Sequence, residues 1–163
     1  MQSPQTAATA KIMPGAQVLG DVVLGAETSV WHNAVIRADV GTVRVGARSN
    51  IQDNSVLHMD DGGALFIGDD VTVGHACILH GCTIGSESLI GMGSIVLDGA
   101  VVGRQCVIGA GSLVTRDTVI PDGMLAFGRP AKVVRPLTED EKEKNRSMAA
   151  KYAARAQKTN KGD

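Results

Sequence analysis

A six-residue repeat runs through most of this 163-residue chain and limits what the chain can fold into. An aliphatic side chain returns at every sixth position, apart from insertions after Ile36 and Leu57 and one shortened step after Leu79. A period of six fits neither the 3.6-residue turn of an α-helix nor the two-residue alternation of a single strand. It is typical of a coil with three flat faces, in which each face is a short strand and each corner a tight turn. The repeat positions are Ile12, Val18, Leu24, Val30, Ile36, Val45, Ile51, Leu57, Ile67, Val73, Leu79, Ile84, Ile90, Val96, Val102, Ile108, Val114 and Ile120.

The composition agrees with such a narrow core. Hydrophobic residues make up 44% of the chain, aromatic residues only 2%, and there are 20 glycines. A triangular coil has room for aliphatic side chains but not for many rings, and its corners need small residues. Since three hexads make one coil, the repeats predict about six stacked coils, roughly 30 Å tall at the ~4.8 Å spacing of paired strands.

The pattern divides the chain into three parts. Residues 12–130 carry the repeat and predict an all-β solenoid, a parallel β-helix of hexapeptide repeats. Residues 1–11 precede it as an N-terminal extension, and residues 131–163 form a C-terminal linker and an α-helix. We expect this helix over residues 138–157, with its small side chains packed alongside the prism.

The start of the expected helix carries the usual N-terminal signals. Thr138 and Glu141 have the spacing of a capping box, acidic residues fill the first turn, and basic residues follow in later turns. These signals fix where the solenoid pattern gives way to a helix.

Charge and cysteine usage bear on partners and location. The net charge is -1, so nothing in the charge balance argues for nucleic acid as a partner. No stretch approaches the ~18 apolar residues of a membrane span, and the N-terminus lacks the features of a signal peptide. Cys77, Cys82 and Cys106 show neither a disulfide framework nor a CxxC pair. We expect a cytoplasmic protein without a membrane partner, whose thiols are small core residues.

Two histidines occupy the same position in neighbouring coils. His58 follows Leu57, and His80 follows Leu79. Leu79 lies 22 residues after Leu57, which is one 18-residue coil plus the four-residue insertion. Their Cα atoms should lie about 5 Å apart, which allows both imidazoles to bind one metal ion at ~2.0–2.1 Å. Arg37 lies one coil below them in the same column, and Leu97 one coil above.

His75 lies on the preceding edge of the prism and is not expected to reach this metal within one chain. A threefold assembly with parallel axes would bring His75 of a neighbouring subunit to His58 and His80. Three histidines with an open fourth position are typical of catalytic zinc. The sequence therefore predicts a homotrimer with three equivalent interface sites.

Simpler interpretations exist for each of these residues. A single histidine on a solenoid surface is most often only a polar side chain, and it is the stacking of two with a third nearby that favours a metal site. His32 shares the His75 column, with Asp53 between them, but it lies two coils away, ~10 Å by strand spacing, and is not counted as a ligand.

Several motifs resemble one family. Hexapeptide repeats of this kind are similar to left-handed parallel β-helices, and the resemblance supplies the handedness. Within that fold, four segments resemble the γ-class carbonic anhydrases. They are Arg37-Ala38-Asp39, Asn50-Ile51-Gln52-Asp53-Asn54, His58, and Gly74-His75-Ala76-Cys77-Ile78-Leu79-His80-Gly81-Cys82.

The resemblance implies a role for each matching residue. It implies that zinc is bound across the trimer interface, by His58 and His80 of one subunit and His75 of the next. It further implies that Arg37 and Asp39 help hold the trimer. By the same resemblance, the remaining three residues act in catalysis: Gln52 on the metal-bound water, Asn50 as a nearby polar residue, and Tyr152 as the tyrosine of bacterial relatives.

The implied activity is reversible hydration of CO2 to bicarbonate by a zinc-bound hydroxide. Fe²⁺ and Co²⁺ suit the same imidazoles. A zinc-dependent acyl-CoA thioesterase and a non-catalytic metal-binding protein are alternatives, and a CoA-dependent acyltransferase is the weakest, since transferases of this fold do not use a three-histidine metal site.

The sequence differs from the archaeal-type members of that family in the residues expected to transfer the proton away from the site. Val40 stands where those members have a glutamate, and residues 59–66 are too short for their acidic loop. Asp60, Asp61 or Tyr152 could take over the proton transfer. Fast hydration is therefore not assured by the sequence.

Overall fold

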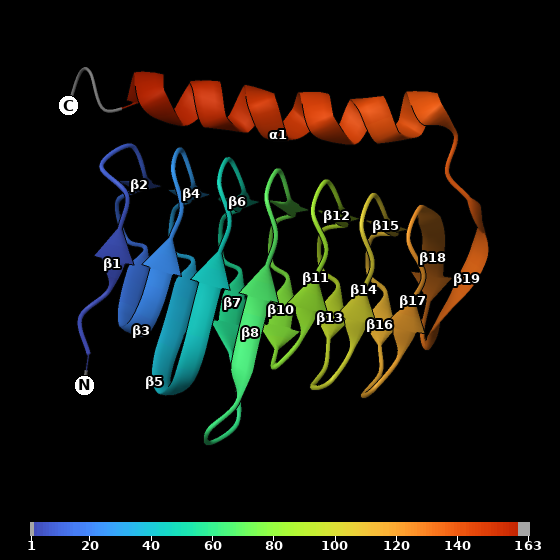
Figure 1. Ribbon diagram of the computed structural model, residues 1–163, viewed down its shortest axis with the longest axis horizontal. Helices are drawn as coiled ribbons and strands as arrows, with labels where there is room; N and C mark the ends of the chain where they lie inside the picture. The colour runs from blue at the N-terminus through green and yellow to red at the C-terminus, as the bar shows by residue number, and fades with distance from the viewer. Residues whose placement is uncertain (1, 160–163) are drawn as a thin grey trace.

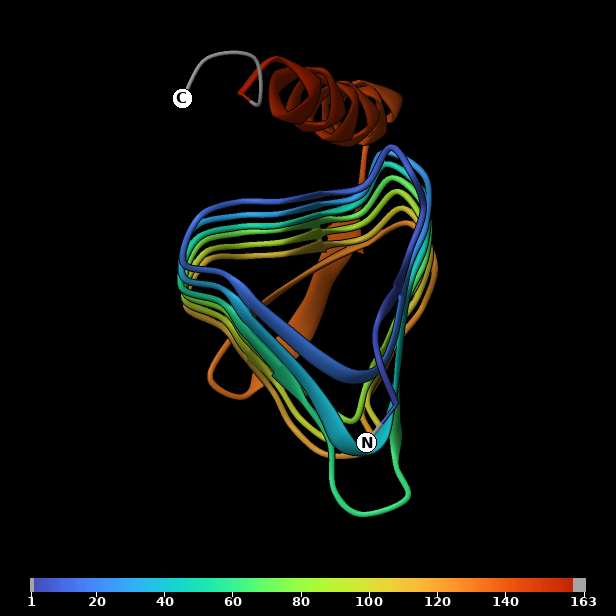
Figure 2. The ribbon, with the colours of Figure 1, turned by 90° about the vertical axis from the view of Figure 1, so that its left-hand side faces the viewer.

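The computed structural model describes residues 2–159, which form about seven coils of a left-handed parallel β-helix with one α-helix along its side (Figure 1). Viewed along the prism axis, the coils superimpose as a three-sided outline (Figure 2). The fold predicted from the six-residue repeat is confirmed, with about seven coils where the repeat count predicts about six, because strands before and after the repeat also pair with it.

Two faces of the prism belong to one sheet, because two long strands bend around a corner and serve both. These strands are β3 (Gln17–Leu24) and β5 (Val35–Val45), and β5 pairs with strands of both faces. The first face continues through β7 (Val56–His58), β10 (Ile78–His80), β13 (Ile95–Val96) and β16 (Leu113–Val114). The second contains β1 (Gln5–Thr6), β8 (Ala64–Ile67), β11 (Thr83–Ile84), β14 (Val101–Val102) and β17 (Val119–Ile120).

The third face is a separate sheet that lies under the helix. Its strands are β2 (Lys11–Ile12), β4 (Ser29–Val30), β6 (Asn50–Ile51), β9 (Thr72–Val73), β12 (Leu89–Ile90), β15 (Val107–Ile108), β18 (Met124–Gly128) and β19 (Ala131–Pro136). All pairs are parallel except β18 with β19, which form an antiparallel end to the sheet.

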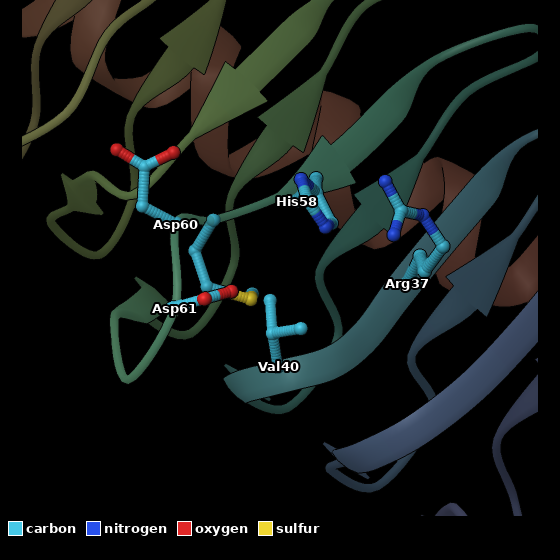
Figure 3. Close-up of a pocket in the computed structure, with 6 residues that line it drawn as sticks. Arg37, Val40, His58, Asp60 and Asp61 are labelled. Carbon is cyan, nitrogen blue, oxygen red and sulfur yellow. The ribbon is translucent and has the colours of Figure 1, made fainter.

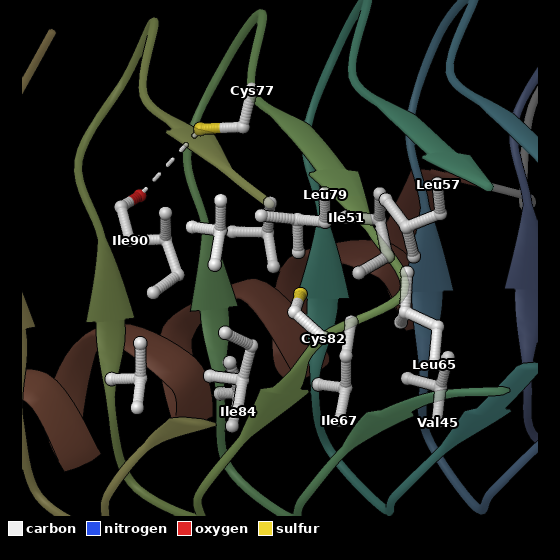
Figure 4. Close-up of a cluster of buried hydrophobic side chains, with 14 of the residues drawn as sticks. Val45, Ile51, Leu57, Leu65, Ile67, Cys77, Leu79, Cys82, Ile84 and Ile90 are labelled. Atoms are coloured by element: carbon white, nitrogen blue, oxygen red, sulfur yellow. Dashed lines mark hydrogen bonds between the residues drawn. The ribbon is translucent and has the colours of Figure 1, made fainter. Parts of the chain in front are cut away.

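The repeat positions form stacked columns in the core (Figure 4). Leu57, Leu79 and Val96, for example, are register partners in successive coils and are completely buried. Cys82 also lies in this core, where burial raises the pKa of its thiol to about 12. The one repeat residue that the structure leaves exposed is Ile12, at 42%, because β2 ends the sheet and has no strand below it.

The ends of the solenoid differ in detail from the predicted division. Residues 5–6 already pair with β3, so strand pairing begins within the segment 1–11. At the other end, 131–136 continue the sheet as β19 before the helix begins. The last four residues of the predicted segment 131–163 lie outside the described part of the chain.

Helix α1 (Glu139–Thr159) runs back along the prism from the β19 end towards the β1 end (Figure 1). It packs against β4, β6 and β9, and its Ala149, Ala153 and Ala156 are buried. The capping box is present, since the N–H of Glu141 donates to Thr138 Oγ1 at 3.2 Å and the N–H of Thr138 donates to the Glu141 carboxylate at 2.8 Å. Nothing in the described helix has the length and apolarity needed to cross a bilayer.

The first turn of α1 gives a pH-dependent contribution to stability. Hydrogen bonds from Arg135 and from the Thr138 N–H lower the pKa of Glu141 from 4.5 to about 2. A folded-state pKa below the unfolded value contributes stability that is complete above pH 4.5 and is lost as the pH falls through about 2. We expect Glu141→Gln, which keeps a capping side chain but loses the ion pair, to be less stable than wild type at pH 7.

Urea unfolding of both proteins between pH 7 and pH 2 measures this difference. The gap should narrow below about pH 4.5 and close near pH 2. Asp140→Asn, in the same helical turn, is the control for loss of charge alone. A gap of constant size down to pH 2 would contradict the assignment.

Candidate metal centre

The predicted stacking of two histidines is present. His58 and His80 end β7 and β10 and are register partners on adjacent strands. Their ring centroids are 5.2 Å apart, and Nδ1 of His58 lies 3.2 Å from Nε2 of His80. Both side chains are partly buried, at 19% and 25% exposure.

Each of these histidines is held by a carboxylate on its other nitrogen. Nδ1 of His80 lies 2.8 and 2.9 Å from the two oxygens of Asp98. Nε2 of His58 lies 3.3 Å from Oδ1 of Asp39. A carboxylate accepts hydrogen bonds only, so each of these nitrogens carries an N–H.

When both rings are neutral, the two remaining nitrogens present lone pairs to each other. Two acceptors at 3.2 Å repel unless a cation or a proton lies between them. Two tetrahedral zinc ligands with bonds of ~2.0–2.1 Å are themselves about 3.3 Å apart. The donor set and its spacing thus fit a divalent metal ion, with His58 and His80 as two of its ligands.

His75 lies at a different corner, immediately before the turn residue Ala76, whose φ is 55°. Its Nδ1 is 2.9 Å from Asp53, which also contacts Nδ1 of His32 at 3.3 Å. Nε2 of His75 is left available, and its side chain is 46% exposed. Among the described residues of the single chain, no candidate metal cluster contains His75 together with His58 or His80.

One acidic cluster does occur within the chain, formed by Asp60, His80 and Asp98. Arg116 offsets part of its charge, since Nη2 lies 3.3 Å from Asp60 and 3.2 Å from Asp98. Asp98 was not among the residues predicted from the sequence, where the polar column ends at Leu97. Asp98 follows Leu97, and its side chain reaches back towards the coil below.

The carboxylates beside the histidines are stabilised in their charged form. For Asp98, hydrogen bonding and charge from His80, with the charge of Arg116, outweigh desolvation and lower the pKa. For Asp39, hydrogen bonds from Arg37 and His58 also outweigh desolvation and lower the pKa. The predicted Arg37–Asp39 pair is present as an ion pair within the chain, and its role in holding a trimer stays a prediction.

A cavity of about 500 Å³ lies beside His58, lined by Arg37, Val40, Met59, Asp60 and Asp61 (Figure 3). The loop between β7 and β8, green in Figure 2, carries the two aspartates beyond the corner of the prism. Asp60 is bound to Arg116, so its carboxylate is already engaged.

Gln52 and Asn50 form a buried amide chain on the His75 edge. Nε2 of Gln52 donates to Oδ1 of Asn50 at 3.0 Å, and Nδ2 of Asn50 donates to Thr72 Oγ1 at 3.0 Å. Asn50 is completely buried, whereas Gln52 retains 4% exposure. Asn50 can therefore orient Gln52 but cannot itself touch a substrate.

A groove of about 300 Å³ begins at Gln52 and Gly74 and runs between the third face and α1. Its walls are mostly apolar and include Met92 and Met148.

Tyr152 is connected to the same edge through aromatic contacts. Its ring packs edge-on against Trp31, with centroids 5.4 Å apart, and Arg155 lies 5.1 Å above it. Trp31 in turn lies 6.1 Å from the ring of His32. The structure gives Tyr152 a packing role, and its predicted part in proton transfer stays a prediction.

Comparisons with known proteins agree with this architecture. The bacterial transferase hexapeptide family (six repeats) matches residues 81–116. The crystal structure of a hexapeptide transferase family protein from Anaplasma phagocytophilum has a TM-score of 0.90 and 44% identity, covering 94% of this chain and 90% of that one.

Two relatives carry a more specific name. The carbonic anhydrase of Geobacillus kaustophilus is 50% identical over 156 residues, covering 96% of this chain and 86% of that protein. The mitochondrial gamma carbonic anhydrase 1 of Arabidopsis thaliana is 41% identical over 90% of this chain and 55% of its own length. The relatives thus bear both transferase and carbonic anhydrase names, which identify a family and not a reaction. The chain belongs to the γ-class carbonic anhydrase-like family of hexapeptide-repeat proteins.

Proposed function

We propose that this chain forms a homotrimer that binds one zinc ion at each subunit interface and reversibly hydrates CO2 to bicarbonate. The observation that carries the proposal is the pair of imidazole nitrogens 3.2 Å apart, each on a ring whose other nitrogen faces a carboxylate. A cytoplasmic location is part of the proposal and is supported by three buried free thiols.

The apolar surface of the first face supports the trimer. This face lies between the corner of His75 and the strand ends of His58 and His80. Val56 and Ile78 project from it with 37% and 43% exposure. A threefold assembly that unites the three histidines would turn this face inwards and remove these side chains from water.

The chain's own residues would each hold or orient one group. His58 and His80 of one subunit and His75 of its neighbour would bind the metal, which supplies a Lewis acid that makes water a nucleophile near neutral pH. Asp39, Asp98 and Asp53 keep the histidine tautomers that expose the binding nitrogens.

Gln52 would direct the water that attacks CO2. Its Nε2 is engaged by Asn50, so its Oε1 is the atom left to accept a hydrogen bond from that water. Because Asn50 is fixed by Thr72, the amide of Gln52 is oriented before substrate arrives. Asn50 thus acts through Gln52.

Stopped-flow CO2 hydration by zinc- and iron-loaded protein tests the proposal. We expect a rate above buffer that is lost when the metal is removed. The metal content and the oligomer mass must be measured on the same samples. Three metals per trimer with no rate above buffer would exclude the hydratase and leave a metal-dependent thioesterase or a non-catalytic metal-binding protein.

Gln52→Ala is expected to lower kcat/KM for hydration by about 10–100-fold, the usual effect of losing a residue that orients a group at the metal. Metal content should stay unchanged because Gln52 is not a ligand. Gln105→Ala, on the corner beside α1, is the matched control and should retain full activity. Equal rates for Gln52→Ala and wild type would remove Gln52 from the mechanism.

A second candidate, hydrolysis of acyl thioesters, is favoured by the groove that starts at Gln52. Its volume of about 300 Å³ is far more than CO2 needs, and its apolar walls suit an acyl chain. A panel of acyl-CoA substrates of increasing chain length, assayed with the metal-loaded protein, distinguishes the two activities.

A further inference from the structure

We propose that Asp98 is a positioning residue for His80 and that Arg116 holds Asp98 in place, so that these two residues set the metal affinity of the site. The inference rests on the metal site of the proposed function but not on the reaction. It concerns metal binding alone and can be tested whether or not the protein hydrates CO2.

The contact between Asp98 and His80 fixes one tautomer. Both oxygens of Asp98 lie within 2.9 Å of Nδ1, so an N–H on Nδ1 has an acceptor in either oxygen. This contact favours the tautomer with its proton on Nδ1, which leaves Nε2, the nitrogen that faces His58, to bind a metal. Asp39 makes only the longer contact of 3.3 Å to His58, so the hold on His80 is the stronger of the two.

The main chain leaves a place for this carboxylate at Gly81. This residue directly follows His80 and has a φ of +53°, in the left-handed region. A Cβ atom at Gly81 would collide with Oδ1 of Asp98. The absence of a side chain therefore allows Asp98 to lie against the backbone beside His80.

Arg116 contacts Asp98 from the next coil, on the side away from His80. It lies one coil beyond Asp98, and its Nη2 contacts Asp98 at 3.2 Å and Asp60 at 3.3 Å. The guanidinium offsets part of the charge of the two carboxylates and holds Asp98 beside His80. It also ties the loop between β7 and β8 to the solenoid, next to the cavity beside His58.

Zinc affinity, measured by competition with a chromophoric chelator, tests the inference on the assembled protein. We expect Asp98→Ala to weaken zinc binding about 10–100-fold and Asp98→Asn, which keeps an acceptor for the N–H, to weaken it less. Gly81→Ala should reproduce the loss by displacing Asp98. Arg116→Gln should give a smaller loss in the same direction.

Asp117→Ala is the control, because this aspartate is exposed and hydrogen-bonds no histidine among the described residues. Its main-chain N–H donates to the carbonyl oxygen of Asp98 at 3.1 Å, a bond that the substitution keeps. It should bind zinc as wild type does. Asp98→Ala protein with an affinity within twofold of wild type would overturn the inference. Wild-type protein that binds no zinc would instead overturn the proposed function.

A second measurement does not depend on metal or on activity. The chain has four histidines, so ¹⁵N chemical shifts of the imidazole nitrogens can be assigned by single substitutions. In metal-free wild type we expect His80 with its proton on Nδ1, and in Asp98→Ala a mixture of both tautomers. An unchanged tautomer in Asp98→Ala would contradict the role of Asp98, even if this variant were less stable.

Discussion

Replacing His75 by alanine is expected to abolish zinc binding at every site of the trimer while leaving the β-helix folded. His75 is nearly half exposed and contacts Asp53 at the surface, so its loss removes a ligand without opening the core. Two imidazoles from His58 and His80 do not complete a catalytic zinc site, which uses three protein ligands. Metal content per subunit, with circular dichroism as the test of folding, measures the effect.

His32→Ala is the matched control for this substitution. His32 contacts the same carboxylate, Asp53, from the opposite side, and its side chain is similarly exposed, at 44%. It should retain full metal content. His75→Ala protein that still holds one metal per subunit would rule out His75 as a ligand.

Mixed trimers test whether the ligands come from different chains. If a site takes His58 and His80 from one subunit and His75 from the next, a trimer of His75→Ala and His58→Ala subunits contains one intact site, whichever chain is in the majority. Neither parent trimer contains any. Recovery of about one zinc per mixed trimer after co-refolding is therefore expected. No recovery in trimers of verified mixed composition would show that each site belongs to one chain.

Leu79→Ala is expected to lower the free energy of unfolding by about 2–5 kcal/mol. Leu79 is completely buried between its register partners Leu57 and Val96. Truncation would leave a cavity that the rigid stacked coils cannot close. Since Leu79 directly precedes His80, the same change should loosen the pairing of the two histidines.

Chemical denaturation of the metal-free protein measures the effect on folding. Val119→Ala is the control, because Val119 is 65% exposed on the second face, which does not carry the histidines. It should change the free energy of unfolding by no more than about 0.5 kcal/mol. A loss below 1 kcal/mol for Leu79→Ala would mean that the coil relaxes around the missing side chain.

Much of the fold could be predicted because each coil repeats the same pattern of inward-facing aliphatic residues. The aliphatic position at every sixth residue had to face inwards, and the structure buries these residues except at the open first coil, where Ile12 has no strand below it. The helix was predicted to within two residues at its ends because its capping box is a local signal. The pairing of residues 5–6 with β3 was missed, since they precede the recognisable repeat.

The candidate site could be predicted where strand register alone determines which residues of neighbouring coils lie side by side. Counting coils placed His58 against His80 correctly and put His75 on another edge. It could not identify Asp98, because register aligns Cα atoms, whereas this side chain crosses to the neighbouring coil through the space left by Gly81. Side-chain direction at a corner depends on local backbone angles that a repeat count does not contain.

The chain of contacts from Asp39 through His58 and His80 to Asp98 crosses four successive coils. In a solenoid, each repeat contacts only its neighbours, and stability is close to a sum of local terms that allows the ends to fray independently. A metal held in this chain, with a ligand from another subunit, would join coils that otherwise have no common partner. Loading the site would then make unfolding of the middle of the prism cooperative with dissociation of the subunits.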